Sequence, residues 1–429
     1  MNSMAPALAV ANAVLYEGYI LFPYTASAKK NRIRWQFGVV VPEAYATNGT
    51  GEAAQAQTEI LLESHGATLV TVRVRFLQVE TRWVQAALES GFETVDSLTV
   101  DGRRHVTFDE GVEREVELQL DPSADASATP IAFSSEERVE QLRDEAGTLH
   151  GRVVRRRWPL HGAVTVQREA VAEHPSLSKL RVRIVNHSAV VPGERSSALR
   201  TAFVSTHTLL YAESGCFLSV LDPPEEAGAQ GASLVNRYTW PVLVATDGPA
   251  KDDAQRSPLV LSSPIILYDF PAVAPQSAGD TFDATEIDEL MMLSVRSLSD
   301  DEREEARATD PRARAIVERA ERFGPGELAD LHGALDIPSM DCVFVQGTKI
   351  AKGSVVRLHP KRRADVWDTF LDGKLATVRA IHQDVENQMY VAVTVDDDPA
   401  SEMHNWYGRS LFFYPDEVEP TAMAARRSP

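Results

Sequence analysis

Three segments in the first 275 residues alternate strictly between apolar and polar side chains: 70–76, 116–120 and 180–184. A period of two places the apolar side chains of a strand on one face and the polar ones on the other. Shorter apolar runs at 202–205 and 259–262 add two candidate strands. Antiparallel strands of this kind bury their apolar faces when one sheet packs on another. The sequence therefore predicts an elaborated antiparallel β-sandwich-like body over residues 14–275.

The segments between these strands are rich in Ala, Gly, Ser, Pro and acidic residues, at 44–57, 121–136 and 223–233. Such residues favour turns, so we expect surface loops there. Residues 1–13 are apolar but lack the basic start and the long apolar core of a signal peptide, and we expect a flexible N-terminus. Residues 421–429 are expected to form a flexible tail.

Residues 276–338 carry helical signals and predict a helical connector. Three helix starts are expected in it, at Asp283, Ser299 and Asp310. Each of the first two has Glu three residues later, the spacing of a capping box. Pro311 follows Asp310 at the first helical position, where no amide proton is needed. Apolar residues then recur with helical spacing at Ala313, Ile316, Val317 and Ala320.

Residues 339–420 again show short β-rich runs, at 355–358, 375–381, 389–395 and 411–414. Turn-forming residues separate them, including Gly373, Asn387 and the Asp-rich segment 396–399. Several short strands with a turn at each reversal are typical of a small SH3-like β-barrel, a fold that usually binds other molecules. The fold class expected for the whole chain is α+β, predominantly β.

The charge balance restricts the partners. Acidic residues outnumber basic ones by 62 to 43, which gives a formal charge of −19 and argues against nucleic acid. Only Cys216 and Cys342 are present, so a disulfide framework is not expected and we predict a cytoplasmic protein. No run approaches the roughly 20 apolar residues of a membrane helix, so we expect no membrane insertion.

Acidic residues crowd one segment of the connector, at Asp280, Asp283, Glu286 and Glu289. Such a cluster could bind a divalent cation, with His332 as a further ligand. A solvated helix start explains the same residues, because a helix dipole favours acids in its first turn, and we favour that interpretation. The eleven histidines form no His-x-x-x-His pair and the cysteines no Cys-x-x-Cys pair, so we expect no cofactor.

A catalytic constellation is not apparent. Ser205 and His207 are two residues apart, hence on the same side of a strand, but no Gly-x-Ser-x-Gly elbow accompanies them. The chain also has no Walker loop and no Gly-x-Gly-x-x-Gly. We therefore predict that the protein is not an enzyme, with a hydrolase of unrecognised site as an alternative.

Two aromatic regions are candidate partner-binding surfaces. The first combines an expected aromatic strand with a basic loop, through Tyr16, Tyr19, Tyr24, Arg32, Arg34 and Trp35. The second is the aromatic end of the barrel, with Trp406, Tyr407, Phe412, Phe413 and Tyr414. Tyr, Trp and Arg are enriched at protein interfaces, but a buried core of aromatics would explain the first set equally well.

Six segments in four groups together resemble a known family: 16–24 with 31–38, 239–244 with 261–269, 274–289, and 406–418. They are similar to an uncharacterised family encoded beside high-affinity nickel–iron uptake hydrogenases, and the similarity spans nearly the whole chain. These segments carry no established catalytic role. The resemblance implies an accessory protein in hydrogenase assembly or function.

We therefore expect a non-enzymatic accessory protein that binds a nickel–iron hydrogenase subunit or a maturation intermediate. One alternative is a protein that handles nickel or iron through the acidic segment 280–289. The other is the hydrolase mentioned above.

Overall fold

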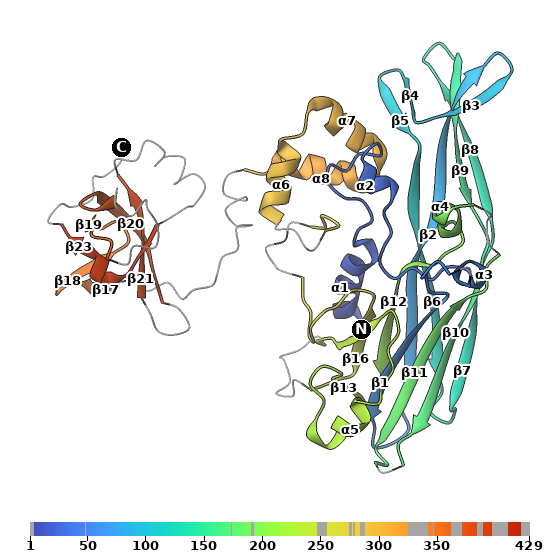
Figure 1. Cartoon of the computed structure of the whole chain (residues 1–429), viewed down its shortest axis with the longest axis horizontal. Coiled ribbons are helices and arrows are strands. Elements are labelled where there is room, and N and C mark those ends of the chain that lie inside the picture. The colour runs from blue at the N-terminus through green and yellow to red at the C-terminus, as the bar shows by residue number, and fades with distance from the viewer. Residues whose placement is uncertain are drawn as a thin grey trace. The chain divides into compact units, whose positions relative to one another are not determined.

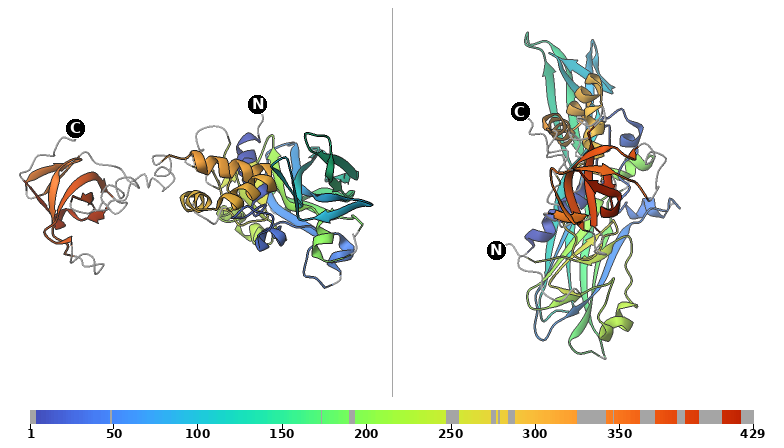
Figure 2. Two further views of the ribbon diagram at one scale, coloured as in Figure 1. Left: turned by 90° about the horizontal axis from the view of Figure 1, so that it is seen from above. Right: turned by 90° about the vertical axis from the view of Figure 1, so that its left-hand side faces the viewer.

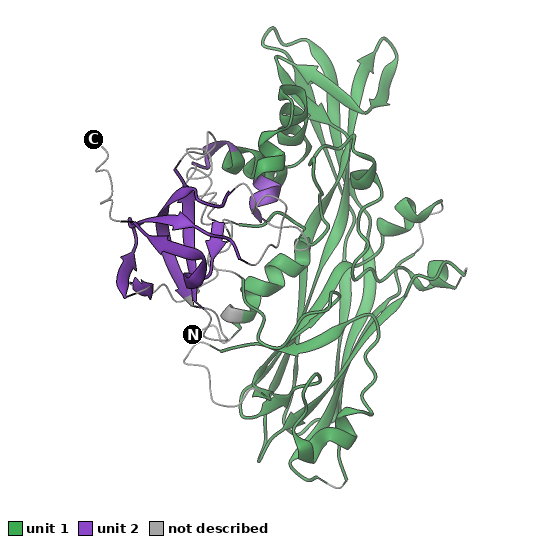
Figure 3. Cartoon of the chain, turned by 60° about the vertical axis from the view of Figure 1, so that its left-hand side comes forward, with its two compact units in different colours: residues 1–287, 293–320 green, residues 288–292, 321–429 purple. Residues whose placement is uncertain are grey.

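The chain is mostly β in its computed structural model, and its strands form several antiparallel sheets (Figure 1). The structure describes residues 4–47, 49–172, 174–189, 193–246, 255–273, 277, 279–283, 288–324, 342–345, 347–361, 371–383, 389–396 and 411–421. The chain divides into two compact units (Figure 3). The first contains residues 1–287 and 293–320, and the second contains residues 288–292 and 321–429.

Two large sheets build the first unit. One has the strand order β15 (Arg256–Ser257), β13 (Cys216–Leu218), β1 (Gln55–Glu63), β11 (Leu177–Asn186), β10 (Leu160–Ala170) and β7 (Ala126–Phe133). The other has the order β14 (Trp240–Leu243), β16 (Leu259–Ser263), β12 (Val204–Ala212), β2 (Val70–Leu88), β9 (Leu149–Arg157) and β8 (Glu136–Arg143). Strands β6 (Phe108–Leu120) and β3 (Gly91–Val95) pair with β2 as well. A separate hairpin joins β4 (Ser97–Val100) to β5 (Arg103–Val106).

The buried side chains of both sheets form one hydrophobic core. The apolar residues of the alternating segment 70–76, at Val70, Val72, Val74 and Phe76, are all fully buried there, which confirms the predicted strand and its face. The ring centroid of Phe76 lies 4.7 Å from that of Phe203 and 6.0 Å from that of Phe133 on β7. This contact between β2 and β7 joins the two sheets.

The N-terminal segment is a helix, α1 (Ala5–Tyr16), although we expected residues 1–13 to be flexible. Ala7, Ala11 and Val14 are buried against Leu209 and Leu261 of the eight-stranded sheet. Their spacing of four and three residues places them on one helix face. The apolar composition of this segment therefore belongs to a core helix, which covers the second face of the sheet.

The short helices of the first unit are α2 (Lys29–Arg32), α3 (Glu43–Ala46), α4 (Arg195–Leu199) and α5 (Gly228–Gly231), with the 3-10 turn η1 (Glu225–Ala227). Three further helices follow, α6 (Asp288–Arg296), α7 (Asp300–Thr309) and α8 (Pro311–Arg322). We expected a connector at 276–338, but α7 and nearly all of α8 belong to the first unit. Figure 2 shows these two helices, in orange, to one side of the strands.

The predicted starts of α7 and α8 are confirmed. Ser299 Oγ accepts a hydrogen bond from Glu302 N at 3.3 Å, and a Glu302 carboxylate oxygen accepts one from Ser299 N at 2.9 Å. Asp310 Oδ1 accepts from Arg312 N at 2.7 Å. The predicted apolar stripe of α8 is buried throughout. The helix start expected at Asp283 runs into residues 284–287, which lie outside the described part of the chain.

The second unit contains a five-stranded antiparallel sheet. Its strand order is β22 (Leu411–Phe413), β21 (Met389–Val395), β20 (Leu375–Gln383), β19 (Val355–Leu358) and β23 (Val418–Pro420), with η2 (Pro415–Glu417) before the last strand. A hairpin of β17 (Cys342–Val345) and β18 (Thr348–Ala351) contributes to the same hydrophobic core. The four β-rich runs predicted here are confirmed as strands. Among the described residues, this sheet does not close into a barrel.

Candidate functional site

The N-terminal aromatic and basic residues form an interior network. Tyr16, Tyr19, Tyr24, Arg34 and Trp35 are at most 6 % exposed, so they do not form the expected exposed surface. The Tyr24 hydroxyl donates to the Thr281 carbonyl at 3.0 Å, and Arg34 Nη1 donates to the Tyr19 carbonyl at 2.7 Å. Burial raises the pKa of Tyr16 and of Tyr19, and it lowers the pKa of Arg34. Only Arg32 of this predicted set is exposed.

The second predicted surface is described only in part. Trp406 and Tyr407 lie outside the described residues. Phe412 is 58 % exposed, whereas Phe413 is buried in the core of the second unit. Tyr414 is half-buried, and its ring centroid lies 4.8 Å from that of Tyr390.

The acidic segment is also described in part. Asp280 is exposed, Asp283 is half-buried and Glu289 is buried, while Glu286 and His332 lie outside the described residues. The Asp280 carbonyl accepts a hydrogen bond from Arg319 Nη1 at 3.2 Å. No group of three or more His, Cys, Asp or Glu residues that could hold a metal ion occurs among the residues that the structure describes.

Ser205 and His207 lie next to each other in a bulge of β12. The Ser205 hydroxyl donates to the Val14 carbonyl at 3.3 Å rather than to the imidazole. His207 Nδ1 donates to the Ser205 carbonyl at 2.9 Å, because a carbonyl oxygen can only accept. Burial, together with the smaller effect of nearby Arg75, lowers the pKa of His207 to about 4. The pair therefore lacks the hydrogen bond from nucleophile to base that nucleophilic catalysis needs.

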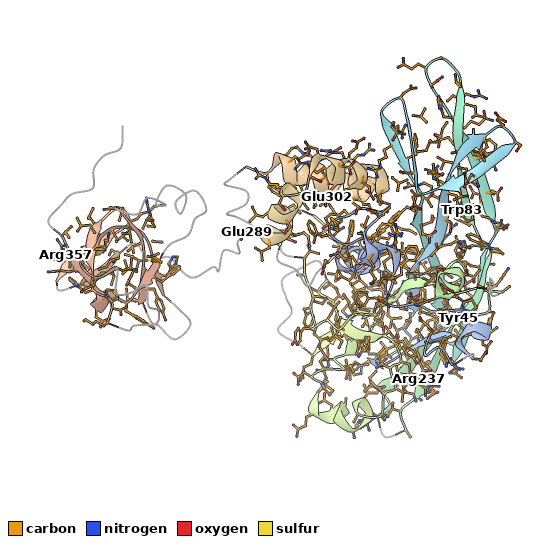
Figure 4. All side chains as sticks on the ribbon, turned by 45° about the horizontal axis from the view of Figure 1, so that its top comes forward. Tyr45, Trp83, Arg237, Glu289, Glu302 and Arg357 are labelled. Atoms are coloured by element: carbon orange, nitrogen blue, oxygen red, sulfur yellow. The ribbon has the colours of Figure 1, made fainter. Side chains whose placement is uncertain are left out.

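A pocket of about 510 Å³ opens in the first unit, and it was not predicted from the sequence. Its walls come from α2, α4, α7 and the strands β2, β4, β5 and β6. Thr81 and Trp83 line it from β2 (Trp83 is labelled in Figure 4), and Arg104 lines it from β5. Arg32 belongs to α2, and Arg200 follows α4 directly. Seven elements thus meet at one concave site.

Three buried polar atoms of the pocket-lining residues have no hydrogen-bond partner among the residues that the structure describes: Trp35 Nε1, Thr81 Oγ1 and Arg200 Nε. Trp35 and Thr81 are only 5 % and 3 % exposed. A buried polar group without a partner costs about 1–3 kcal/mol of folding free energy. Trp35 also adopts a φ of +65°, which is strained for a residue with a bulky side chain. Unsatisfied polar groups and backbone strain together are typical of a binding site.

The charged groups of this pocket differ in how they are paired. Arg104 forms ion pairs with Asp301 at 3.2 Å and with Glu305 at 3.3 Å. The Arg200 guanidinium stacks on Trp158 and Trp83, at 4.8 and 5.7 Å from the ring centroids. Neither Arg200 nor Arg32 forms an ion pair with any carboxylate that the structure describes. Arg200 and Arg32 could therefore pair with a bound anion.

A second feature is an exposed apolar patch formed by Tyr238, Trp240, Ile266 and Tyr268, which we call the apolar patch. Their exposed fractions are 58, 43, 75 and 86 %. Two contacts bring their segments together, because Trp240 pairs with Ser263 and the Phe270 amide donates to the Leu243 carbonyl at 2.7 Å. These contacts are three residues apart on β14, or about 10 Å. The patch therefore lies at one edge of the eight-stranded sheet, and Arg237, which is labelled in Figure 4, directly precedes Tyr238 in the chain.

An open groove adjoins the patch. It has a volume of about 810 Å³, and Arg237 and Tyr238 line it together with Glu43, Glu52 and Arg183. Charged side chains of both signs beside large apolar ones resemble the polar rim and apolar centre of a protein interface. This arrangement suits contact with another protein.

Neither the protein-family models nor the curated proteins contain a match to this chain. In the part of the chain that the structure describes, no helix has the length and apolar character needed to cross a membrane.

Proposed function

We propose that this chain is a non-enzymatic accessory protein that binds another protein through its apolar patch. The main support for this proposal is that four large apolar side chains, three of them aromatic, are exposed at one edge of a sheet. Exposed apolar groups that gather in one place mark interaction sites, whereas single ones are ordinary. Tyr and Trp also contribute most to binding energy at protein interfaces.

The proposed partner is a nickel–iron hydrogenase subunit or a maturation intermediate of that enzyme. The support for this partner is the resemblance described above. Two of its segments, 239–244 and 261–269, contribute Trp240, Ile266 and Tyr268 to the patch. The acidic net charge of −19 favours a protein over nucleic acid as partner.

We further propose that the first unit is an elaborated β-sandwich and that the second is an SH3-like barrel. One hydrophobic core shared by two antiparallel sheets supports the first assignment. The second assignment is supported by five short strands, four of which follow one another in the sheet in the order of the sequence. The cytoplasm is the proposed compartment because the chain has only two cysteines, both free thiols.

Co-purification from native cells tests the partner. The whole chain, carrying an affinity tag, is recovered after brief chemical cross-linking, and the proteins bound to it are identified by mass spectrometry. We expect a hydrogenase structural subunit or a maturation protein to be enriched over a sample without the tagged chain. Recovery free of every hydrogenase component, with and without cross-linking, would contradict the proposed partner.

A further inference from the structure

We propose that the pocket lined by Arg32, Thr81, Trp83 and Arg200 binds a small carboxylate with a flat apolar body. Two arginines that form no ion pair with a described carboxylate supply the charge that holds the carboxylate, and the half-buried ring of Trp83 accepts the flat body. This site is separate from the apolar patch and does not depend on the partner proposed above.

The environment of Arg200 is the strongest support. Its guanidinium lies against two tryptophan rings, and its Nε is buried without a partner among the described residues. Arg200 is half-buried, and an arginine that is partly removed from water is stabilised when it pairs with an anion. A carboxylate can accept two parallel hydrogen bonds from a guanidinium. A bound ligand would therefore supply the partner that no described residue provides.

Several other arginines of the same unit are paired with carboxylates. Arg138 and Arg157 both form ion pairs with Glu80, at 3.0 and 3.3 Å, and Arg155 pairs with Glu110 at 3.3 Å. These side chains lie on the strands β8 and β9. Arg200 and Arg32 differ from them, and both line the same pocket.

The remaining walls define the body of the ligand. Trp83 is half-buried and provides aromatic surface, and Thr81 provides a hydroxyl group that has no hydrogen-bond partner among the described residues. The volume of about 510 Å³ lies within the range of roughly 300–1,000 Å³ for small-molecule sites. Flat apolar groups pack well against aromatic rings. A ligand of about two fused rings with one acidic group suits this space.

The acidic residues of the pocket limit the charge of the ligand. Asp96 and Asp109 line it, and Glu305 is already paired with Arg104. Like charges repel more strongly where the surroundings exclude water. A monoanion should therefore bind better than a ligand with several negative charges.

Calorimetric titration of the whole chain with 2-naphthoate tests this proposal. We expect saturable binding, and binding of the neutral analogue 2-naphthamide that is weaker by roughly tenfold or more, because hydrogen bonds to charged groups are the strong ones. Arg200→Met, which keeps an unbranched apolar stem but lacks the guanidinium, should weaken 2-naphthoate binding to the same extent. The matched control is Arg156→Met, because Arg156 also stacks on Trp158, at 5.2 Å, but does not line the pocket.

Three results would overturn the proposal: no saturable binding of 2-naphthoate, equal affinity for 2-naphthamide, or an unchanged affinity in Arg200→Met. If Arg200→Met does not keep the circular dichroism spectrum of the wild type, the affinity of Arg32→Met for 2-naphthoate tests the proposal instead. Arg32 is exposed, so its replacement should leave the fold intact. An unchanged affinity in that variant would also contradict the proposal. Because none of these measurements uses a protein partner, their failure is distinct from a failure of the proposed function.

Discussion

The hydroxyl of Tyr19 donates a hydrogen bond of 2.9 Å to Oδ2 of Asp310, 291 positions along the chain. The same hydroxyl accepts one from the Gly111 amide of β6 at 3.0 Å. Asp310 meanwhile caps α8 with its other carboxylate oxygen, which accepts from the Arg312 amide. One buried side chain thus joins the N-terminal segment, the eight-stranded sheet and the helices. This network explains why α7 and α8 belong to the first unit.

Replacing Tyr19 with Phe removes this link. The change leaves Asp310 Oδ2 and the Gly111 amide without a buried partner, so we expect a loss of about 1–3 kcal/mol in the free energy of unfolding. Urea denaturation followed by circular dichroism measures it. The control is Tyr45→Phe, because the structure shows no hydrogen bond of the half-buried Tyr45 hydroxyl to any described residue. Equal stability of the two variants would contradict the role of Tyr19.

The network also shows where sequence reasoning was insufficient. The segment from Tyr16 to Trp35 was predicted as an aromatic strand beside a basic loop, but it forms a helix end, turns and the short helix α2, and its tyrosines, Arg34 and Trp35 are buried. Composition alone cannot separate the two cases, because Tyr, Trp and Arg suit both interfaces and buried polar networks. The deciding contacts, to Thr281 and Asp310, come from residues more than 250 positions away.

The pH dependence of stability should include a contribution from His207. Its pKa is about 4 in the folded chain and near 6.5 when unfolded, so the unfolded chain binds the additional proton between these values. The stabilisation by neutral His207 is therefore fully present above pH 6.5 and is lost as the pH falls toward 4. Its magnitude is on the order of 3 kcal/mol.

Comparing variants isolates this contribution from that of the carboxylates. Urea denaturation at pH 7 and at pH 4.5 gives the pH-dependent part of the unfolding free energy. We expect this part to be smaller in His207→Gln than in the wild type, and unchanged in the control His65→Gln, whose side chain is exposed. The same pH dependence in all three proteins would show that His207 titrates normally.

Ser205 should not react as a nucleophile. It is 3 % exposed, and its hydroxyl is directed to the Val14 carbonyl. We expect a fluorophosphonate probe to leave Ser205 unmodified in the native chain, as judged by peptide mass spectrometry. Labelling of Ser205 that is prevented by His207→Gln would instead support the hydrolase alternative.

A strand could be predicted from the sequence where one of its faces is apolar and the other is polar. The segments 116–120 and 180–184 lie in β6 and β11 as predicted, because one face of each meets the core. Strand β7 was predicted as part of a loop, since Ala126–Phe133 is rich in small residues and contains Pro130. It is an edge strand of the six-stranded sheet, where proline is tolerated. The pocket was not predictable from local pattern, because Thr81, Arg104 and Arg200 come from separate elements.

The apolar patch can be tested without disturbing the fold. Ile266 and Tyr268 are 75 and 86 % exposed, so replacing both with Ser should change the unfolding free energy by no more than about 0.5 kcal/mol per site. If the patch contacts the partner, the amount of partner that co-purifies after cross-linking should be roughly tenfold lower with the double variant than with the wild type. The reason is that aromatic anchors contribute most to binding. Val139→Ser is the control, since Val139 is 53 % exposed on β8, at the other end of the sheet order. Equal recovery by both variants would place the partner elsewhere on the chain. Loss of recovery only in the double variant, with unchanged stability, would assign the interface to this edge of the sheet.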